Sequence, residues 1–244
     1  PWTRRRARES ASAHAVQMLD SVGVSQPEVR AEQWPHQFSG GMRQRAMIAM
    51  AMTLGPELLI ADEPTTALDV TVQAQVLELM QRLQADLGMA IIMITHDLGI
   101  IADMAERVLI MYAGKVMEAA ARRETYYEPH HPYTCGLLRS LPQSGHEGEP
   151  LVPIAGQPPS LIRPPVGCPF SPRCAYVMPK CRVDPPPLFL LPASPEHRSA
   201  CWLPLDLVGL SDQVDAARRL ASATETASWT GAEGEPGLAQ GARP

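Results

Sequence analysis

The spacing of hydrophobic positions changes from one segment to the next along the first half of the chain. Between residues 72 and 87 apolar side chains recur every three or four positions, as on one buried helix face, and Gly88 follows where a helix commonly ends. The short apolar runs Leu58–Ala61 and Ala90–Thr95 lie on either side of this segment. They have the length of strands, and the first reads as a buried parallel strand. With a further helical run expected over Met42–Leu54, the alternation predicts an α/β fold.

The pattern changes after residue 106. Arg107–Tyr112 and Lys115–Ala119 are strand-like and flank Ala113-Gly114, a pair that suits a tight hairpin turn. Most of the 25 prolines follow, between Pro129 and Pro204. We therefore predict three parts: an α/β domain over residues 1–128, a proline- and cysteine-rich extension over 129–204, and a tail over 205–244. The tail is expected to be disordered, because it has too little apolar surface to offset its ordering entropy.

The composition excludes two classes of protein. The 244 residues carry a net charge of −5, which argues against nucleic-acid binding driven by overall charge. The longest stretch without a charged side chain, Pro150–Ile162, is far shorter than the roughly 20 apolar residues that cross a bilayer. The arginine-rich opening also lacks the apolar segment of a secretory signal.

Two adjacent carboxylates follow the first apolar run. Asp62 and Glu63 come directly after Leu58–Ala61, at the carboxyl end of the expected strand, where open α/β sheets bind ligands. An aspartate at this point can hold Mg²⁺, and the next carboxylate can face an attacking water, as in phosphate-binding-loop ATPases. The alternative interpretation is a solvated Asp-Glu turn, because short motifs are loose.

Two other segments end in residues that suit a phosphate site. Ser39, Gly40 and Gly41 stand before a helical run, so the serine can cap the helix and free amides can attract phosphate. His96 follows Ala90–Thr95 and is expected at the same sheet edge as the two carboxylates. Taken alone, Ser39, Gly40 and Gly41 are also typical of an ordinary helix cap, and His96 is also typical of a surface histidine. Their convergence favours a site.

Together these segments resemble the ATP-binding subunits of ABC transporters. Ser39–Gln44 is similar to the signature motif, Leu58–Glu63 to the Walker B strand, Ala67–Asp69 to the D-loop, and His96 to the switch histidine. The strings Pro35–Phe38 and His131–Thr134 are similar to the oligopeptide and dipeptide importer branch. The resemblance runs from residue 15 to residue 203. It implies an α/β fold, a partial ABC-type P-loop ATPase core followed by a Pro/Cys-rich C-terminal extension.

The resemblance implies a role for each matched residue. Asp62 would support Mg²⁺ and its water, Glu63 would be the general base, and His96 would contact the γ-phosphate of ATP. Asp69 would communicate across a dimer of ATPase subunits. The signature residues would bind ATP held by the second subunit; they are Ser39, Gly40, Gly41 and Gln44. Catalysis of phosphoryl transfer is mostly positioning and charge stabilisation, which closure of two subunits supplies.

The resemblance also implies partners and a location. The expected function is ATP hydrolysis that energises import of peptides, at the cytoplasmic face of the membrane, beside membrane permease subunits and with an extracytoplasmic solute-binding protein as indirect partner. No nucleic-acid partner is expected. The solute stays open among dipeptides, oligopeptides and nickel. Two alternatives are a non-hydrolysing, cluster-bearing docking module that supplies only its signature motif, and a soluble ABC ATPase of DNA repair or translation.

The phosphate loop of the family, Gly-x-x-x-x-Gly-Lys-Ser/Thr, does not occur in this sequence. Lys115 follows Gly114, but Leu109 and Val116 stand where the motif needs glycine and Ser or Thr. We therefore expect Pro1 to be an internal residue of a longer subunit. We also expect this chain alone neither to bind ATP tightly nor to turn it over.

The last four of the five cysteines are close together in the sequence, with the spacing C-x5-C-x6-C-x19-C; they are Cys168, Cys174, Cys181 and Cys201. Without an export signal, metal or cluster ligation is a better explanation than disulfides. A structural zinc site usually begins with a shorter C-x2–4-C knuckle. Wider gaps favour a four-iron cluster, which some members of the resembled family carry on such cysteines. Zinc and an unligated set remain as alternatives. Cys135 is expected to be a buried packing residue.

Overall fold

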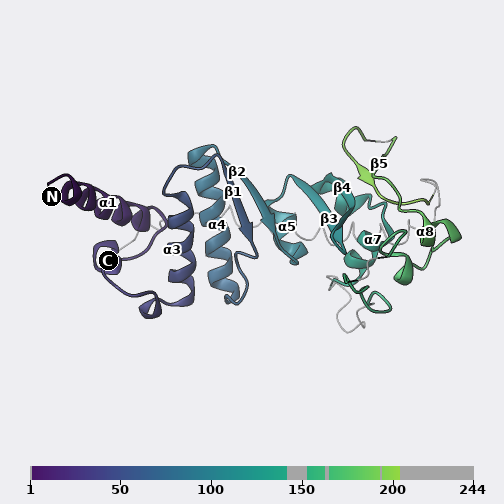
Figure 1. Cartoon of the computed structure of the whole chain (residues 1–244), viewed down its shortest axis with the longest axis horizontal. Coiled ribbons are helices and arrows are strands. Elements are labelled where there is room, and N and C mark those ends of the chain that lie inside the picture. The colour runs from purple at the N-terminus through teal and green to yellow at the C-terminus, as the bar shows by residue number, and fades with distance from the viewer. Residues whose placement is uncertain (1, 142–152, 163–164, 193, 204–244) are drawn as a thin grey trace, which may run out of the picture. The chain divides into compact units, whose positions relative to one another are not determined.

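The computed structural model divides the chain into two compact units, residues 1–98 and residues 99–244, and each is described by itself (Figure 1). The structure describes residues 2–141, 153–162, 165–192 and 194–203. The tail predicted over residues 205–244 therefore lies outside the described residues.

The N-terminal unit combines helices with a two-stranded parallel sheet. Strands β1 (Leu58–Asp62) and β2 (Ala90–Ile94) pair in parallel, with Asp62 opposite Ile94. Helices α3 and α4 lie side by side next to the strands in Figure 1. The helical elements of this unit are α1 (Trp2–Ser21), α2 (Pro27–Ala31), the short 3-10 turn η1 (Pro35–Gln37), α3 (Gly40–Met52) and α4 (Val70–Leu87). The predicted strand–helix–strand order is thus present in the structure.

Helix α4 begins and ends at the residues that its sequence favours. Asp69 is the N-cap, and its side chain accepts a hydrogen bond from the Val72 N–H at 2.9 Å. Gly88 is the C-cap with φ of +65°, a left-handed conformation that glycine adopts without strain. Of the stripe predicted from the periodicity, Val76, Leu79 and Leu83 are buried, and Met80 is buried as well although it was not predicted. Leu87, also predicted to belong to it, is exposed.

One prediction about β1 is wrong in this structure. Leu58–Ala61 was expected to be buried on both faces, but only Leu59 and Ala61 are buried, whereas Leu58 and Ile60 are exposed. On β2 the outward-facing Ile92 is exposed in the same way. Strand residues alternate between two faces, and in this structure the protein covers one face of the pair.

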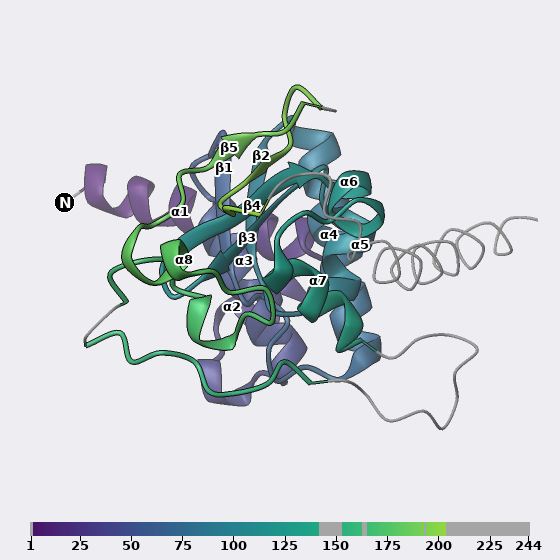
Figure 2. The ribbon, with the colours of Figure 1, turned by 90° about the vertical axis from the view of Figure 1, so that its right-hand side faces the viewer.

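The C-terminal unit contains a four-stranded antiparallel sheet with the order β3-β4-β6-β5. Figure 2 shows β3 and β4 side by side, joined by a tight turn in which Ala113 and Gly114 both have positive φ, as the sequence predicted. Its elements are α5 (Leu98–Met104, whose first residue is counted with the other unit), β3 (Arg107–Tyr112), β4 (Lys115–Ala121), α6 (Arg122–Tyr127), α7 (Pro132–Arg139), η2 (Ser171–Arg173), α8 (Pro179–Val183), β5 (Phe189–Leu190) and β6 (Arg198–Ser199).

The division into compact units falls at residue 98, not at the composition change near 128. The hairpin belongs to the C-terminal unit, because its strand β4 pairs with β6, with Glu118 opposite Ser199. An apolar cluster connects the hairpin with the cysteine segment: Tyr112 and Met117 are buried together with Phe170. The rings of Tyr112 and Phe170 meet edge to face, with centroids 5.4 Å apart.

Candidate functional site

The parallel pairing of β1 and β2 brings a carboxylate and an imidazole together at one sheet edge. The Glu63 N–H donates to the carbonyl of Ile94 at 2.8 Å, which extends the pairing by one residue beyond β1. The Nδ1 atom of His96 then lies 3.0 Å from Oε1 of Glu63. Both side chains are substantially exposed, with 78% of His96 and 45% of Glu63 accessible. The structure thus joins two residues that lie 33 positions apart in the sequence.

The turn after β1 holds the other oxygen of the same carboxylate. The Thr66 hydroxyl donates to Oε2 of Glu63 at 2.7 Å. Glu63 itself has a φ of +45°, a left-handed conformation that costs a non-glycine residue about 1–3 kcal/mol. The side chain is therefore aimed by the turn and fixed by donors at both oxygens. Thr66 was not among the predicted site residues, although a hydroxyl residue three positions after a carboxylate in a turn is a signal for such a contact.

These donors favour the ionised form of Glu63. The hydrogen bond from Thr66 and then the contact with His96 hold the pKa of Glu63 below its ordinary value of 4.5. Glu63 is accordingly a carboxylate at neutral pH and able to accept a proton. A carboxylate with both oxygens held in place at a strand end is suited to orient and deprotonate a water molecule.

The residues of the predicted signature motif form the start of α3. Ser39 is the N-cap, and its hydroxyl accepts from the Met42 N–H at 3.3 Å, as expected. The helix therefore begins at Gly40, two residues before the predicted start. A Cβ added to Gly41 would lie 2.7 Å from Cγ1 of Val72, so this glycine allows α3 and α4 to approach. Gln44 is half-buried one turn further on.

The remaining predicted nucleotide residues are exposed. Asp62 is the last residue of β1 and stands beside Glu63 at the sheet edge. Asp69 caps α4, which gives it a defined structural role in addition to the predicted one. Asp62, Glu63 and His96 are thus gathered at one edge, whereas Ser39, Gly40 and Asp69 are at helix starts of the same unit.

In the C-terminal unit the four clustered cysteines line one pocket. Cys168 and Cys181 are buried, Cys174 and Cys201 are partly buried, and all are free thiols. The Cys168 N–H donates to the carbonyl of Cys181 at 2.8 Å. Gly167 permits this contact, because an added Cβ would lie 2.3 Å from the Cys181 carbonyl oxygen. The fold thus gathers residues that are spread over 34 positions of the sequence.

Two opposing effects act on these thiols. Burial raises the pKa of Cys168 and Cys174, and raises that of Cys201 to about 12, so these three thiols are protonated at neutral pH. Backbone N–H groups act in the other direction, lowering the pKa: those of Phe170 and Ser171 on Cys168, and that of Leu203 on Cys201, 3.5 Å from its sulfur. Such donors stabilise sulfur that carries negative charge.

The donor set fits a thiolate-bound group in its chemistry, since four thiols line one pocket and backbone N–H groups act on the sulfurs of Cys168 and Cys201. In the described part of the chain, however, no three metal-ligating side chains converge as they would around a bound ion. Binding would have to draw the sulfurs inward and release their protons. Cys135 is separate and fully buried; burial raises its pKa to about 12, consistent with the packing role predicted for it.

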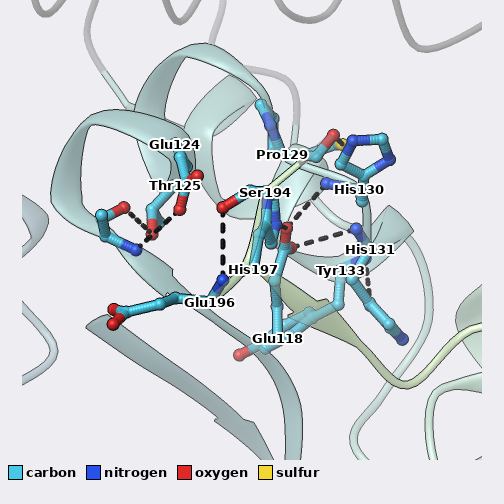
Figure 3. A network of polar contacts seen from close by, with 12 residues as sticks. Glu118, Glu124, Thr125, Pro129, His130, His131, Tyr133, Ser194, Glu196 and His197 are labelled. Atoms are coloured by element: carbon cyan, nitrogen blue, oxygen red, sulfur yellow. Dashed lines mark hydrogen bonds and ion pairs between the residues drawn. The ribbon is translucent and has the colours of Figure 1, made fainter. Parts of the chain in front are cut away.

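A buried carboxylate next to this pocket was not predicted. Glu118 on β4 is 1% exposed and accepts the N–H groups of His130 at 2.7 Å and His131 at 3.0 Å (Figure 3). The Nε2 atom of His197 lies 2.6 Å from the same carboxylate and is 2% exposed. Buried charges persist in proteins when they are paired and hydrogen-bonded in this way. Glu118 therefore joins β4, the start of α7 and the segment before β6.

His131 links this network to the pocket. His131 lines the pocket together with the four cysteines. Its Nδ1 accepts the N–H of Tyr133 at 3.0 Å, which caps α7. Burial lowers the pKa of His131 to about 4, so the ring is neutral at pH 7. The sequence motif His131–Thr134 pointed to this helix start but not to the pocket.

Comparison with known proteins assigns both parts of the chain. The profile of the family described as "ABC transporter" matches residues 3–66, and that described as "Oligopeptide/dipeptide transporter, C-terminal region" matches residues 117–181. The oligopeptide transport ATP-binding protein OppD of Salmonella typhimurium is 49% identical over 200 residues, and the dipeptide transport ATP-binding protein DppD of Bacillus subtilis is 49% identical over 201. The chain belongs to the oligopeptide/dipeptide ABC-transporter ATP-binding family.

Within this ATP-binding family the match covers most of this chain but only part of its relatives. The alignments with the Salmonella and Bacillus proteins each take in 82% of this chain and 59% of the relative. OppD of Bacillus subtilis is 50% identical over 198 residues, which are 81% of this chain and 55% of that protein. The α/β fold of the N-terminal unit agrees with the ABC-transporter ATPase profile. Among the described helices, none is long and apolar enough to span a membrane.

Proposed function

We propose that this chain provides catalytic residues of an ATP-hydrolysing subunit that drives peptide import. The observation that carries the proposal is the Glu63–His96 pair, 3.0 Å apart at the shared edge of β1 and β2. The relatives are named for oligopeptide and dipeptide transport, which supports peptides as solute. They lend no support to the non-hydrolysing docking module or to an ATPase of DNA repair or translation.

In this mechanism Glu63 accepts a proton from the water that attacks the γ-phosphate. The low pKa of Glu63 keeps it ionised, while Thr66 and His96 hold its two oxygens in one orientation. With Nδ1 of His96 directed at Glu63, its other ring nitrogen is available to the phosphate. Asp62, next to Glu63, would support Mg²⁺, which supplies charge neutralisation at the phosphates.

The helix-start residues serve a second ATPase subunit in this proposal. Ser39, Gly40, Gly41 and Gln44 would contact ATP held by that subunit, and Asp69 would transmit closure of the dimer. The free N–H groups at the start of α3 are suited to bind phosphate oxygens. Membrane permease subunits, an extracytoplasmic solute-binding protein and a position at the cytoplasmic face of the membrane belong to the same proposal.

The four cysteines are proposed to hold a metal–thiolate group, with a four-iron cluster preferred to zinc. The shared pocket and the N–H groups that act on Cys168, Cys174 and Cys201 support this assignment. Analysis of iron, acid-labile sulfide and zinc in anaerobically purified protein tests it. Iron and sulfide in equal amounts are expected; zinc without sulfide would overturn the cluster, and neither metal would overturn the site.

A chimera provides the catalytic test, since the sequence holds no phosphate loop. The N-terminal part of the Salmonella relative would precede this chain, and ATP hydrolysis would be measured in the assembled transporter. Glu63→Gln is expected to lower kcat by about 10²–10⁴-fold, the usual contribution of a general base. The matched control is Glu57→Gln, an exposed carboxylate just before β1, with an expected rate within twofold. Equal rates for both variants would contradict the proposal. The chain alone is expected to show no turnover.

A further inference from the structure

Among the described residues, a buried ring nitrogen beside the cysteine pocket has no partner at hydrogen-bond geometry. His131 is one of the residues that line the pocket and is 1% exposed. In the described part of the chain no group meets its Nε2 at hydrogen-bond geometry, although the Ala200 carbonyl acts on the ring and raises its pKa against the larger effect of burial. Leaving a buried polar atom unpaired costs about 1–3 kcal/mol. Because the Ala200 carbonyl does not meet Nε2 at hydrogen-bond geometry, a group bound in the pocket would supply a better acceptor.

The hydrogen bond at the other ring nitrogen decides what Nε2 can do. The Tyr133 N–H donates to Nδ1 of His131 at 3.0 Å, so Nδ1 presents its lone pair. A neutral imidazole with a lone pair at Nδ1 carries its proton at Nε2. In this tautomer Nε2 is an N–H donor without a lone pair. His131 therefore cannot ligate a metal ion through Nε2, but it can donate a hydrogen bond into the pocket.

The donor is held in position on both sides of the residue. The His131 backbone N–H binds Oε2 of Glu118 at 3.0 Å, and Glu118 is itself held by His197 (Figure 3). The ring is held through Nδ1, as described above. Because backbone and ring are both fixed, the direction of the Nε2–H is set before any group enters the pocket, so little further ordering is needed.

We propose that His131 donates its Nε2–H to a negatively charged sulfur atom of the group held by Cys168, Cys174, Cys181 and Cys201. This inference rests on the cysteine site of the proposed function. The acceptor is a thiolate of a zinc site, or a thiolate or sulfide of an iron–sulfur cluster; the two share the same chemistry. An N–H···S bond withdraws charge from sulfur, so it stabilises the reduced form of a cluster and raises its reduction potential.

Three variants of the full chain separate this role from a structural one. His131→Leu removes the donor. His131→Gln keeps an oxygen that can accept the Tyr133 N–H and an amide N–H that can reach the position of Nε2. His130→Leu removes the neighbouring ring, which contacts the His197 ring at 5.1 Å between centroids but does not line the pocket. Circular dichroism would establish that each variant is folded.

The experiment tests the two kinds of bound group, an iron–sulfur cluster and a metal–thiolate site, separately. In the first, chains reconstituted anaerobically with iron and sulfide are titrated for midpoint potential. In the second, chains loaded with Zn²⁺, or with Co²⁺ as an optical probe, compete against a chelator. We expect His131→Leu to lower the midpoint potential or to weaken metal retention about 10–100-fold, the usual cost of losing a hydrogen bond to a ligand. His131→Gln should recover most of the loss, and His130→Leu should match the wild type.

The outcomes distinguish the two proposals. Unchanged potential and unchanged retention in His131→Leu would overturn the role of His131 while the cysteine site stands. Equal losses in His131→Leu, His131→Gln and His130→Leu would overturn it as well, because they would indicate a general structural effect. A wild-type chain that retains neither iron nor zinc would overturn the cysteine site and, with it, this inference.

Discussion

Nδ1 of His96 lies 3.0 Å from Oε1 of Glu63, although the two residues follow different strands. The contact exists because β1 and β2 are parallel and in register, so that residues just beyond their carboxyl ends meet. Thr66 supplies a second donor from the turn. The ionisation of Glu63 therefore depends on both the sheet and the turn.

Thr66→Val is expected to raise the pKa of Glu63 toward its ordinary value. The variant keeps the shape of the side chain but removes the hydroxyl that contributes most to the lowered pKa. The pKa is measured by ¹³C NMR of the Glu63 carboxyl carbon as a function of pH. Thr71→Val, at an exposed position of α4, is the control and should leave the titration unchanged. No difference between the two variants would show that Thr66 does not act on Glu63.

The same lowered pKa has a defined consequence for stability. Because the folded pKa lies below the unfolded one, the stabilising effect is complete above the ordinary pKa of 4.5. This stabilisation is lost as the pH falls through the pKa of Glu63 in the folded protein. Thr66→Val should reduce this acid-side dependence.

Gly41→Ala is expected to destabilise the N-terminal unit by about 1–3 kcal/mol, the usual cost of overpacking. The added Cβ would lie 2.7 Å from Cγ1 of Val72, so α3 and α4 must separate or Val72 must move. Gly40→Ala is the matched control, since its nearest neighbour would be Leu68 at 3.8 Å. Urea denaturation measures both. Adding Val72→Ala should recover part of the loss from Gly41→Ala; additive losses would contradict the steric explanation.

Glu118→Gln is expected to destabilise the C-terminal unit by about 3–5 kcal/mol, as removal of one partner from a buried charge pair does. The new amide group would face backbone N–H donors and leave one of them unpaired. Asp184→Asn provides the contrast, because Lys180 and Asp184 are about half exposed and 3.8 Å apart. Such a pair contributes about 0–1 kcal/mol. Urea denaturation followed by NMR of the unit's amides measures both; equal losses would show that burial of Glu118 is not decisive.

The His131 ring is expected to stay neutral well below pH 6.5, with its proton on Nε2, which ¹⁵N NMR detects directly. Its folded pKa of about 4 lies below the ordinary 6.5 because of burial, so protonation favours the unfolded chain. Stability should fall as the pH drops from 6.5 toward 4, by up to about 3 kcal/mol from this residue. His131→Gln should remove that part of the dependence. A proton on Nδ1 at pH 7 would contradict the tautomer and the donor role derived from it.

Sequence patterns predicted the elements of the candidate site better than its side-chain contacts. The apolar runs before Glu63 and His96 predicted two strand ends, and parallel pairing then required them to meet. The caps Ser39 and Gly88 were predictable because each carries a local backbone preference. Thr66 was missed because a hydroxyl in a turn follows no periodicity.

Local sequence patterns could not predict contacts between segments that are far apart in the chain. Glu118 and His197 are 79 residues apart, and neither lies in a sequence motif that would predict a buried pair. The boundary predicted near residue 128 followed proline content, whereas the compact units divide at 98 because β4 pairs with β6. Leu58 and Ile60 were predicted to be buried from their apolar character alone, which does not reveal how many faces of a strand are covered.

The position of β6 in the sheet has a consequence for folding order. Because β4 pairs with a strand that begins at Arg198, the sheet cannot be completed until the ribosome has released almost the whole extension. Closing a loop of this length carries an entropic cost that is not recovered until the pairing forms, so contacts of this kind slow folding. Cys201 is the second residue after β6, so the fourth thiol joins the other three only in this late step. During synthesis there would be a stage at which Cys168, Cys174 and Cys181 are present but Cys201 has not yet joined the pocket.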